Sequence, residues 1–224
     1  MRICALIPAF NEAPHIAKVV EGAREHVADV VVIDDGSSDG TADIARSAGA
    51  TCLQLRRNCG KASALRAGIA FAREHNFTHV ITLDGDGQHL PEDIPVLLRV
   101  AEETRADLVI GARSFDRAHM PRSRYFSNII GSRLASALVG RKIRDSQCGF
   151  RLFRLDKLGD AKLRSRCYEL EMEILIKMAR SGCTIAHAPV RMIYDDGEAR
   201  SKMKPVRDTV RVCLWSLAFR FLGA

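Results

Sequence analysis

The sequence predicts an α/β fold whose mostly parallel sheet is covered by helices on both faces. The first observation is that short runs rich in Val, Ile and Leu alternate with segments of helical spacing over the first half of the chain. The second is that polar clusters follow directly after these runs. The expected strands are Ile3 to Ile7, Val30 to Ile33, Thr51 to Leu55, Val80 to Leu83 and Leu108 to Ile110, and the expected helices are His15 to His26, Thr41 to Ala48, Ala62 to His75 and Pro91 to Thr104.

Each expected element has a local signal. The strands are near-continuous apolar runs, as in a parallel sheet that is buried on both faces. The helix from Thr41 ends just before Gly49, and the last of the four helices begins at Pro91, which suits a first helical turn. A further apolar helical stretch, around Ile129 to Val139, lies among many arginines. Because strands alternate with helices, the polar clusters gather at the carboxyl ends of the strands, where such sheets bind ligands.

The composition is that of an ordinary globular protein. Of 224 residues, 47% are hydrophobic and 27% are charged, which excludes a disordered chain, a collagen-like repeat and a disulfide-dense miniature. We expect one main domain at residues 1–200 and a basic, amphipathic segment at 201–224. The net charge of +7 suits phosphate-bearing molecules, nucleic acid or an anionic membrane. The few aromatic residues, with three Tyr and one Trp, argue against nucleic acid.

The cysteines and apolar segments predict a cytoplasmic location. The seven cysteines are scattered without a C-x-x-C pair, which favours reduced thiols. The N-terminal stretch lacks the longer apolar region of a signal peptide. The best candidate for a membrane span, Val212 to Phe219, is short and is bounded by Arg211 and Arg220. We therefore expect a chain that does not cross a membrane by itself.

The loop from Asp84 to His89 has the composition of a metal site. Two carboxylates on one tight turn repel each other, so this arrangement favours a divalent cation or several hydrogen-bond donors as a partner. Oxygen ligands from Asp86 and Gln88 suit Mg²⁺ or Mn²⁺ and leave coordination positions for phosphate oxygens. The alternative is an acidic surface turn, because Asp-Gly pairs are common in turns.

A second acidic loop, Asp34 to Gly40, ends another expected strand. Ser38 or Asp39 can cap the following helix, which explains part of the loop structurally. Capping does not explain Asp34 and Asp35 at the strand end, where a carboxylate can accept hydrogen bonds from a ribose or a base. Two acidic loops at one sheet edge therefore favour a binding site.

Several short motifs occur in a specific order along the chain. They are Pro8-Ala9-Phe10-Asn11-Glu12, Val32 to Thr41, Gly60-Lys61, Asp84 to His89 with Pro91-Glu92, Gly111-Ala112-Arg113, and Asp145 to Arg151. Each is weak alone, but the ordered set resembles the inverting family 2 glycosyltransferases of the GT-A fold. The closest resemblance is to the dolichol-phosphate and polyprenyl-phosphate mannosyltransferases and glucosyltransferases. It covers about residues 1–155 well and the remainder more loosely.

The resemblance implies a binding site for a nucleotide-diphosphate sugar such as GDP-mannose or UDP-glucose. It assigns donor contacts to Pro8, Phe10, Glu12, Asp35, Asp84, Gly85 and Lys202. It assigns Mg²⁺ or Mn²⁺ to Asp86 and Gln88, with the metal acting on the diphosphate leaving group. Two departures affect the donor contacts: Phe10 stands where relatives more often have Tyr, and Asp196 stands where a C-terminal motif has Arg.

The resemblance also implies a polyprenyl-phosphate acceptor, whose anionic oxygen needs no general base. Arg113, Arg124 and Ser127 are the expected acceptor-phosphate ligands, on the family's Arg and Arg-x-x-Ser pattern. Asp86, Arg113 and Asp145 are the expected catalytic residues. A hydroxyl acceptor on a glycolipid or glycan would instead need a base, for which Asp145 is the obvious residue, although its position equally suits ordering the loop over the donor.

The basic, apolar stretch from Val206 to Leu222 predicts contact with a membrane surface. The alternative is a helix that packs on the domain, on a membrane protein or on a second copy of the chain. We expect a peripheral enzyme at the cytoplasmic face of the membrane. A non-catalytic binder of sugar nucleotides is disfavoured by the intact Asp84 and Asp86 pair. The stretch from Tyr168 to Glu173 resembles a family segment near the acceptor side, but its glutamates, spaced by two, are expected to lie mostly on a solvated helix surface.

Overall fold

The computed structural model describes residues 1–113, 122–159, 163–165, 169–193, 211, 212 and 214–216, with only the backbone described for 122–124. One seven-stranded sheet organises this part of the chain, in the order β3-β2-β1-β4-β6-β5-β7. The strands are β1 (Ile3–Ala9), β2 (Asp29–Asp34), β3 (Thr51–Gln54), β4 (His79–Thr82), β5 (Leu108–Arg113), β6 (Arg151–Arg154) and β7 (Ile185–Val190).

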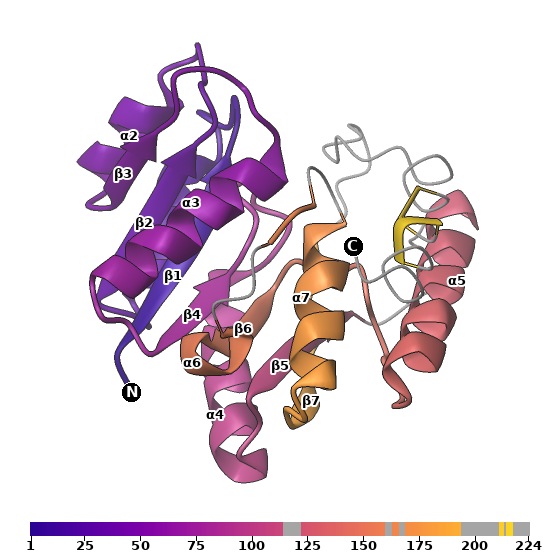
Figure 1. Cartoon of the computed structure of the whole chain (residues 1–224). Helices are drawn as coiled ribbons and strands as arrows, with labels where there is room; N and C mark the ends of the chain where they lie inside the picture. The colour runs from indigo at the N-terminus through magenta and orange to yellow at the C-terminus, as the bar shows by residue number, and fades with distance from the viewer. Residues whose placement is uncertain (114–121, 160–162, 166–168, 194–210, 213, 217–224) are drawn as a thin grey trace.

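Helices connect most of these strands. They are α1 (Ile16–Arg24), α2 (Thr41–Ser47), α3 (Lys61–Glu74), the 3₁₀ turn η1 (Pro91–Asp93), α4 (Ile94–Thr104), α5 (Arg122–Val139), α6 (Leu155–Leu158) and α7 (Leu170–Arg180). In Figure 1, α3 and α7 lie across the near face of the sheet, and α5 stands at its right-hand side. The helix expected from Pro91 begins as η1 and continues as α4, which packs on β5, β6 and β7.

The sheet is parallel except at β6. β1 pairs in parallel with β2 and β4, whereas β6 runs antiparallel between β4 and β5. Arg151, the first residue of β6, pairs with Thr82 near the end of β4 and with Ile110 in β5. The start of β6 therefore lies at the same sheet edge as the carboxyl ends of its neighbours. This confirms the expected mostly parallel α/β fold and adds β6, α6 and β7, which the sequence analysis does not include.

The core is formed by the apolar strands and the helices packed on them. Leu6, Ile33 and Ile81 are all at most 2% exposed. Gly68 lets α3 approach the sheet, because a Cβ atom there would lie 2.8 Å from the Cδ1 atom of Ile33. This close packing fixes α3 against β1 and β2, and so fixes the position of its first residue, Lys61.

The predicted C-terminal helix from Val206 to Leu222 is described only at residues 211, 212 and 214–216, which are helical. The expected boundary between residues 200 and 201 lies outside the described residues. Within the part of the chain that the structure describes, no helix combines the length and apolar character that a membrane span requires.

Candidate active site

The loops that carry the predicted site residues meet at one edge of the sheet. β1 ends at Ala9 and β2 at Asp34, which pair directly with each other. The loop after β4 carries Asp84, and Gly85 packs closely on the end of β1, since a Cβ atom there would lie 3.3 Å from the carbonyl oxygen of Pro8. The ends of β4 and β5 and the start of β6 complete this edge, as the register shows.

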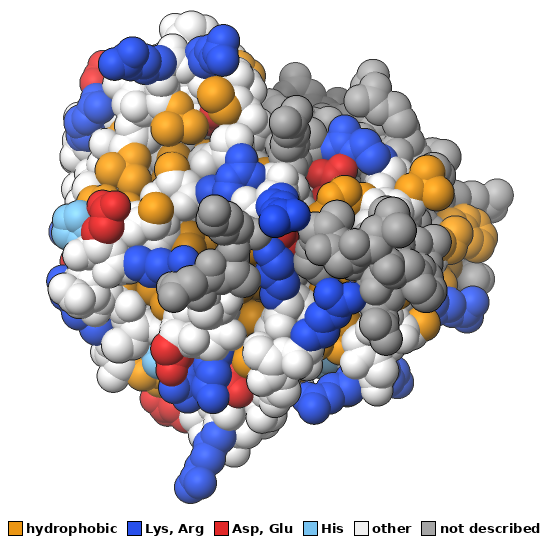
Figure 2. All heavy atoms as spheres, viewed as in Figure 1, with side chains coloured by type: hydrophobic (Ala, Val, Ile, Leu, Met, Phe, Trp, Pro, Cys, Tyr) orange, Lys and Arg blue, Asp and Glu red, His pale blue; other side chains and the backbone are white. Residues whose placement is uncertain are grey.

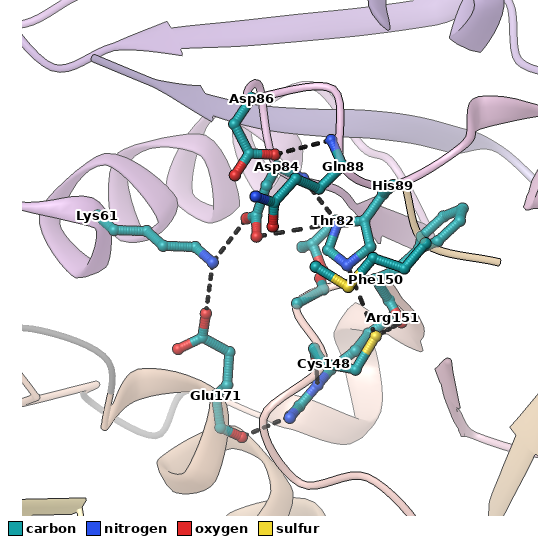
Figure 3. A network of polar contacts seen from close by, with 12 residues as sticks. Lys61, Thr82, Asp84, Asp86, Gln88, His89, Cys148, Phe150, Arg151 and Glu171 are labelled. Atoms are coloured by element: carbon teal, nitrogen blue, oxygen red, sulfur yellow. Dashed lines mark hydrogen bonds and ion pairs between the residues drawn. The ribbon is translucent and has the colours of Figure 1, made fainter. Parts of the chain in front are cut away.

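Asp84 is held from two sides. Its Oδ1 atom is 2.6 Å from Nζ of Lys61, and its backbone N–H donates to Nδ1 of His89 at 3.4 Å (Figure 3). Burial alone raises the pKa of Asp84, but the charge of Lys61, the largest opposing cause, brings the pKa below its ordinary value. Arg113 adds to this lowering, so its guanidinium acts on the same carboxylate. Asp84 is therefore kept ionised by groups of the protein itself.

His89 serves as a neutral support of this loop. Its side chain is buried, and burial lowers its pKa to about 4. A neutral ring accepts the Asp84 amide at Nδ1, which leaves its proton on Nε2, 3.7 Å from Sγ of Cys148. His89 therefore helps to shape the turn that carries Asp84.

Asp86 has the opposite electrostatic environment. Burial, followed by the charges of Asp84 and Glu12, raises the pKa of Asp86 to about 6. The backbone N–H of Gln88 donates to its Oδ1 atom at 3.0 Å. At neutral pH Asp86 is ionised, although its surroundings disfavour the negative charge. A bound cation would stabilise this charge.

The residues present fit Mg²⁺ or Mn²⁺. Asp86 and Gln88 supply oxygen donors, and Mg²⁺ in proteins is bound by one or two carboxylates together with substrate phosphates and water. Among the described residues, no group of three or more His, Cys, Asp or Glu side chains is arranged to hold a metal alone. Coordination of a donor diphosphate by such a metal stays a prediction.

Lys61 and Glu171 also belong to this site, although neither is among the predicted site residues. Nζ of Lys61 bridges Oδ1 of Asp84 at 2.6 Å and Oε1 of Glu171 at 2.9 Å (Figure 3). Glu171 is 8% exposed, and Glu169 and Glu173 are also buried, so the expectation of a solvated helix surface is wrong. The reason is that each of the three glutamates pairs with a different cation: Glu169 with Arg211, Glu171 with Lys61 and Glu173 with Lys177. The Gly60-Lys61 motif was the available signal for Lys61.

Arg151 secures the loop that faces Asp84. It is 1% exposed and donates to three carbonyl oxygens, those of Cys148 at 2.8 Å, Ser146 at 2.7 Å and Glu171 at 2.6 Å. Thr82 adds a hydrogen bond to the carbonyl of Gly149 at 2.7 Å. These bonds hold residues 146–151 and the start of α7 in one arrangement around Lys61.

The predicted nucleoside side of the site is also assembled. Both carboxylate oxygens of Asp35 accept backbone N–H groups, from Cys59 at 2.8 Å and Gly60 at 2.7 Å. Asp35 therefore sets where α3 begins, and its contact with a nucleoside stays a prediction. The Glu12 amide donates to Oγ1 of Thr41 at 2.9 Å, which fixes the loop that also carries Pro8 and Phe10.

The N-cap position of α2 is Gly40, so the expectation that Ser38 or Asp39 caps this helix is wrong, but Asp39, one residue earlier, still binds the first turn. Its Oδ1 atom accepts the backbone N–H of Thr41 at 3.1 Å, and Oδ2 accepts that of Ala13 at 3.0 Å. The bond from Ala13 joins this acidic loop to the loop after β1.

Arg113 and Asp145 form a buried bidentate pair. Nε and Nη2 of Arg113 donate to the two carboxylate oxygens at 2.6 Å and 2.8 Å. The Asp145 side chain is fully buried and that of Arg113 is 11% exposed. With both oxygens bound to a guanidinium, Asp145 is arranged to orient Arg113, and it is not arranged to accept a proton from a hydroxyl group.

Of the remaining predicted site residues, only Ser127 has a described side chain. Ser127 is on α5 and is 6% exposed, and its carbonyl oxygen accepts Nε2 of Gln147 at 3.4 Å. Arg124 is in α5, but its side chain is outside the described residues, and so is the whole of Lys202.

Comparisons with known proteins identify the family of this chain. Residues 4–160 match the profile of glycosyl transferase family 2. An uncharacterized protein of Methanocaldococcus jannaschii is 39% identical over 205 residues, covering 86% of this chain and 88% of that protein. The undecaprenyl-phosphate mannosyltransferase of Micrococcus luteus is 31% identical over 238 aligned residues, covering 100% of this chain and 97% of that protein.

A solved structure shows the same fold. Glucosyl-3-phosphoglycerate synthase from Mycobacterium tuberculosis, in complex with Mn²⁺, uridine diphosphate and glucosyl-3-phosphoglycerate, has a TM-score of 0.71 and 20% identity, covering 97% of this chain and 79% of that chain. The fold and the family match together define a glycosyltransferase of the GT-A fold. The chain belongs to glycosyl transferase family 2.

Proposed function

We propose that this enzyme transfers a hexose, from GDP-mannose or UDP-glucose, to polyprenyl phosphate with inversion at the anomeric carbon and with Mg²⁺ or Mn²⁺ as cofactor. The observation that carries the proposal is that the loop of Asp84, Asp86 and Gln88, which follows β4, and Arg113, which ends β5, lie at one edge of the sheet. A cation site for a diphosphate thus adjoins a guanidinium for a phosphate. The Micrococcus relative, which spans the whole chain, is named for an undecaprenyl-phosphate substrate and supports this choice.

The donor is bound at the loops after β1, β2 and β4. Pro8, Phe10, Glu12 and Asp35 line the nucleoside side, and Asp84 and Gly85 lie beneath it. Asp86 and Gln88 hold the metal, which supplies positive charge to the departing diphosphate. Lys202 contributes a further cation to the donor phosphates. Lys61 keeps Asp84 ionised and in place. Asp84 can then contact the donor while Asp86 binds the metal.

Transfer needs no proton acceptor when the acceptor is a phosphate. An anionic oxygen of the lipid phosphate forms the new bond to the anomeric carbon, and the bond from that carbon to the diphosphate breaks, with its electron pair leaving on the diphosphate. Arg113, Arg124 and Ser127 hold the acceptor phosphate against the repulsion of the donor. The bidentate bond from Arg113 to Asp145 supports this acceptor, because a hydroxyl acceptor would need a free base and Asp145 is engaged at both oxygens.

The proposal places the enzyme at the cytoplasmic face of a membrane, where its acceptor is anchored. Exposed apolar side chains on α5 support a membrane contact: Phe126 and Ile130, four residues apart, are each 56% exposed. Figure 2 shows hydrophobic side chains at the right-hand edge of the molecule, over α5. Leu214, in the described part of the C-terminal segment, is 64% exposed.

The acceptor class is tested by a transfer assay with purified protein and Mn²⁺. Labelled GDP-mannose and UDP-glucose are supplied in parallel with undecaprenyl phosphate, with undecaprenol or with a glycolipid carrying free hydroxyl groups. We expect lipid-linked sugar from one donor with undecaprenyl phosphate only. Product with the glycolipid and none with the lipid phosphate would contradict the proposal.

A further inference from the structure

A second feature of the molecule lies beside Arg113. A groove of about 840 Å³ runs between α5, residues 142–144 and the ends of β5 and β7. Its volume is in the range of pockets that bind small organic molecules. Because Arg113 and Ala112 form one end of its wall, the groove begins at the same sheet edge as the proposed acceptor-phosphate site.

The groove is lined by an excess of positive charge. Arg133, Lys142, Arg144 and Arg191 line it together with Arg113, and no Asp or Glu is among the described residues of its wall. Arg191 is compensated by Asp93, at 2.8 Å. In the part of the chain that the structure describes, Arg133, Lys142 and Arg144 have no carboxylate within ion-pair distance, and all three are exposed. Cations gathered without counter-charge favour an anionic ligand.

The floor of the groove is apolar and held in shape. Ile129, Ile143 and Val190 line it, and the last two are only 3% and 5% exposed. The amide of Ile143 donates to Oγ of Ser136 on α5 at 2.9 Å. The next amide, that of Arg144, donates to Nε2 of His187 on β7 at 3.2 Å. Residues 142–144 are therefore fixed to both walls, and the groove exists before any ligand binds.

A small inorganic anion would use the cations but not the apolar floor. A neutral apolar molecule would use the floor but gain nothing from the cations. A ligand that combines a phosphate with an apolar chain satisfies both. Ile129 contributes apolar surface to the groove from α5, and the next residue of that helix, Ile130, is 56% exposed.

We infer that this groove binds the isoprenoid chain of the acceptor lipid, with Arg133, Lys142 and Arg144 attracting its phosphate toward Arg113. The identity of the lipid rests on the proposed function, and the groove itself is a binding site distinct from the donor site. The first isoprene units then lie on Ile129, Ile143 and Val190. The groove selects lipids by chain as well as by phosphate.

The test compares the double variant Arg133→Gln/Arg144→Gln with a control that loses two exposed cations elsewhere, Lys18→Gln/Arg99→Gln. Direct binding of undecaprenyl phosphate in detergent is measured by titration, independently of transfer. We expect the groove variant to bind about tenfold more weakly, which is about 1.4 kcal/mol, and the control to bind as the wild type does. Binding of Mn²⁺ and nucleotide should be unchanged in both variants, which shows that they are folded. Equal lipid binding by the groove variant and wild type would overturn the inference.

Further probes identify what the groove recognises. Undecaprenol lacks the phosphate, farnesyl phosphate has a shorter chain, and inorganic phosphate has no chain. We expect all three to bind the wild type more weakly than undecaprenyl phosphate. Ile129→Ser should weaken undecaprenyl phosphate binding and leave inorganic phosphate unaffected. Equal affinity for phosphatidylglycerol vesicles that lack the prenyl lipid would overturn the inference in favour of general anionic-membrane binding. Lipid binding in the groove without sugar transfer would instead contradict the proposed function and leave this inference standing.

Discussion

Asp86→Asn should make the protein more stable in the absence of metal. The side chain keeps an oxygen that accepts the Gln88 amide, so the variant removes charge and little else. In the wild type, burial and then Asp84 raise the pKa of Asp86 from 3.8 to about 6. An acid whose pKa is raised on folding destabilises the folded state once it ionises. The penalty is absent below about pH 4 and fully present above about pH 6.

The magnitude follows from that rise in pKa. It corresponds to about 3 kcal/mol for a fully buried group. Because the Asp86 side chain is only partly buried, screening by water reduces the expected gain to about 1–2 kcal/mol at pH 7.5. Urea unfolding of metal-free protein measures this gain, which should shrink as the pH is lowered toward 4.5. Asp43→Asn is the matched control, because the Asp43 side chain is 85% exposed.

Metal and nucleotide should reverse the order of stability. A ligand at a hundred times its Kd stabilises the folded state by about 2.7 kcal/mol. Mn²⁺ with the nucleoside diphosphate should therefore stabilise the wild type by about this amount and leave Asp86→Asn almost unchanged. A variant that is no more stable than wild type without metal, or that gains equally from metal and nucleotide, would refute the assignment of Asp86.

Three further changes test the surrounding network. Asp145→Asn removes the carboxylate charge that pairs with the buried guanidinium of Arg113 and should cost about 3 kcal/mol of unfolding free energy in urea; a loss below about 1 kcal/mol would contradict the positioning role. Glu171→Gln removes one negative charge near Asp84, so calorimetry should show Mn²⁺ with nucleotide binding several-fold more weakly, and unchanged affinity would exclude this role for Glu171. Gly68→Ala places a Cβ atom into the sheet and should lower the Tm, with a net cost of about 1 kcal/mol; a higher Tm would show that α3 moves freely.

The sequence predicts the first half of the fold, where strands and helices alternate. The strands from Ile3 and Val30 and the helix from Thr41 begin within one residue of their expected positions, because apolar runs and turn residues bound them clearly. β6 was not anticipated, since its four residues are fixed by pairing with β4 and β5, which are distant in sequence. Short strands of this kind carry little local signal.

The site was predictable for residues that directly follow or end a strand, because the strand fixes their place at the sheet edge. Asp84, Asp86 and Arg113 lie at the expected sheet edge. The pairing of Asp145 with Arg113 and the bridge from Lys61 to Glu171 depend on which segments the fold brings together, so spacing along the chain does not reveal them. The buried glutamates of α7 show the same limit, because periodicity alone cannot tell a solvated carboxylate from one with a buried partner.

The most direct test of the account is transfer to undecaprenyl phosphate by protein stripped of metal and then supplied with Mn²⁺. Wild type and Asp86→Asn are compared, and the mass of the lipid product is determined. The account predicts a hexose attached to the intact lipid phosphate, formed by the wild type only when Mn²⁺ is restored and not formed by the variant. Equal product without metal, or from Asp86→Asn, would contradict the account.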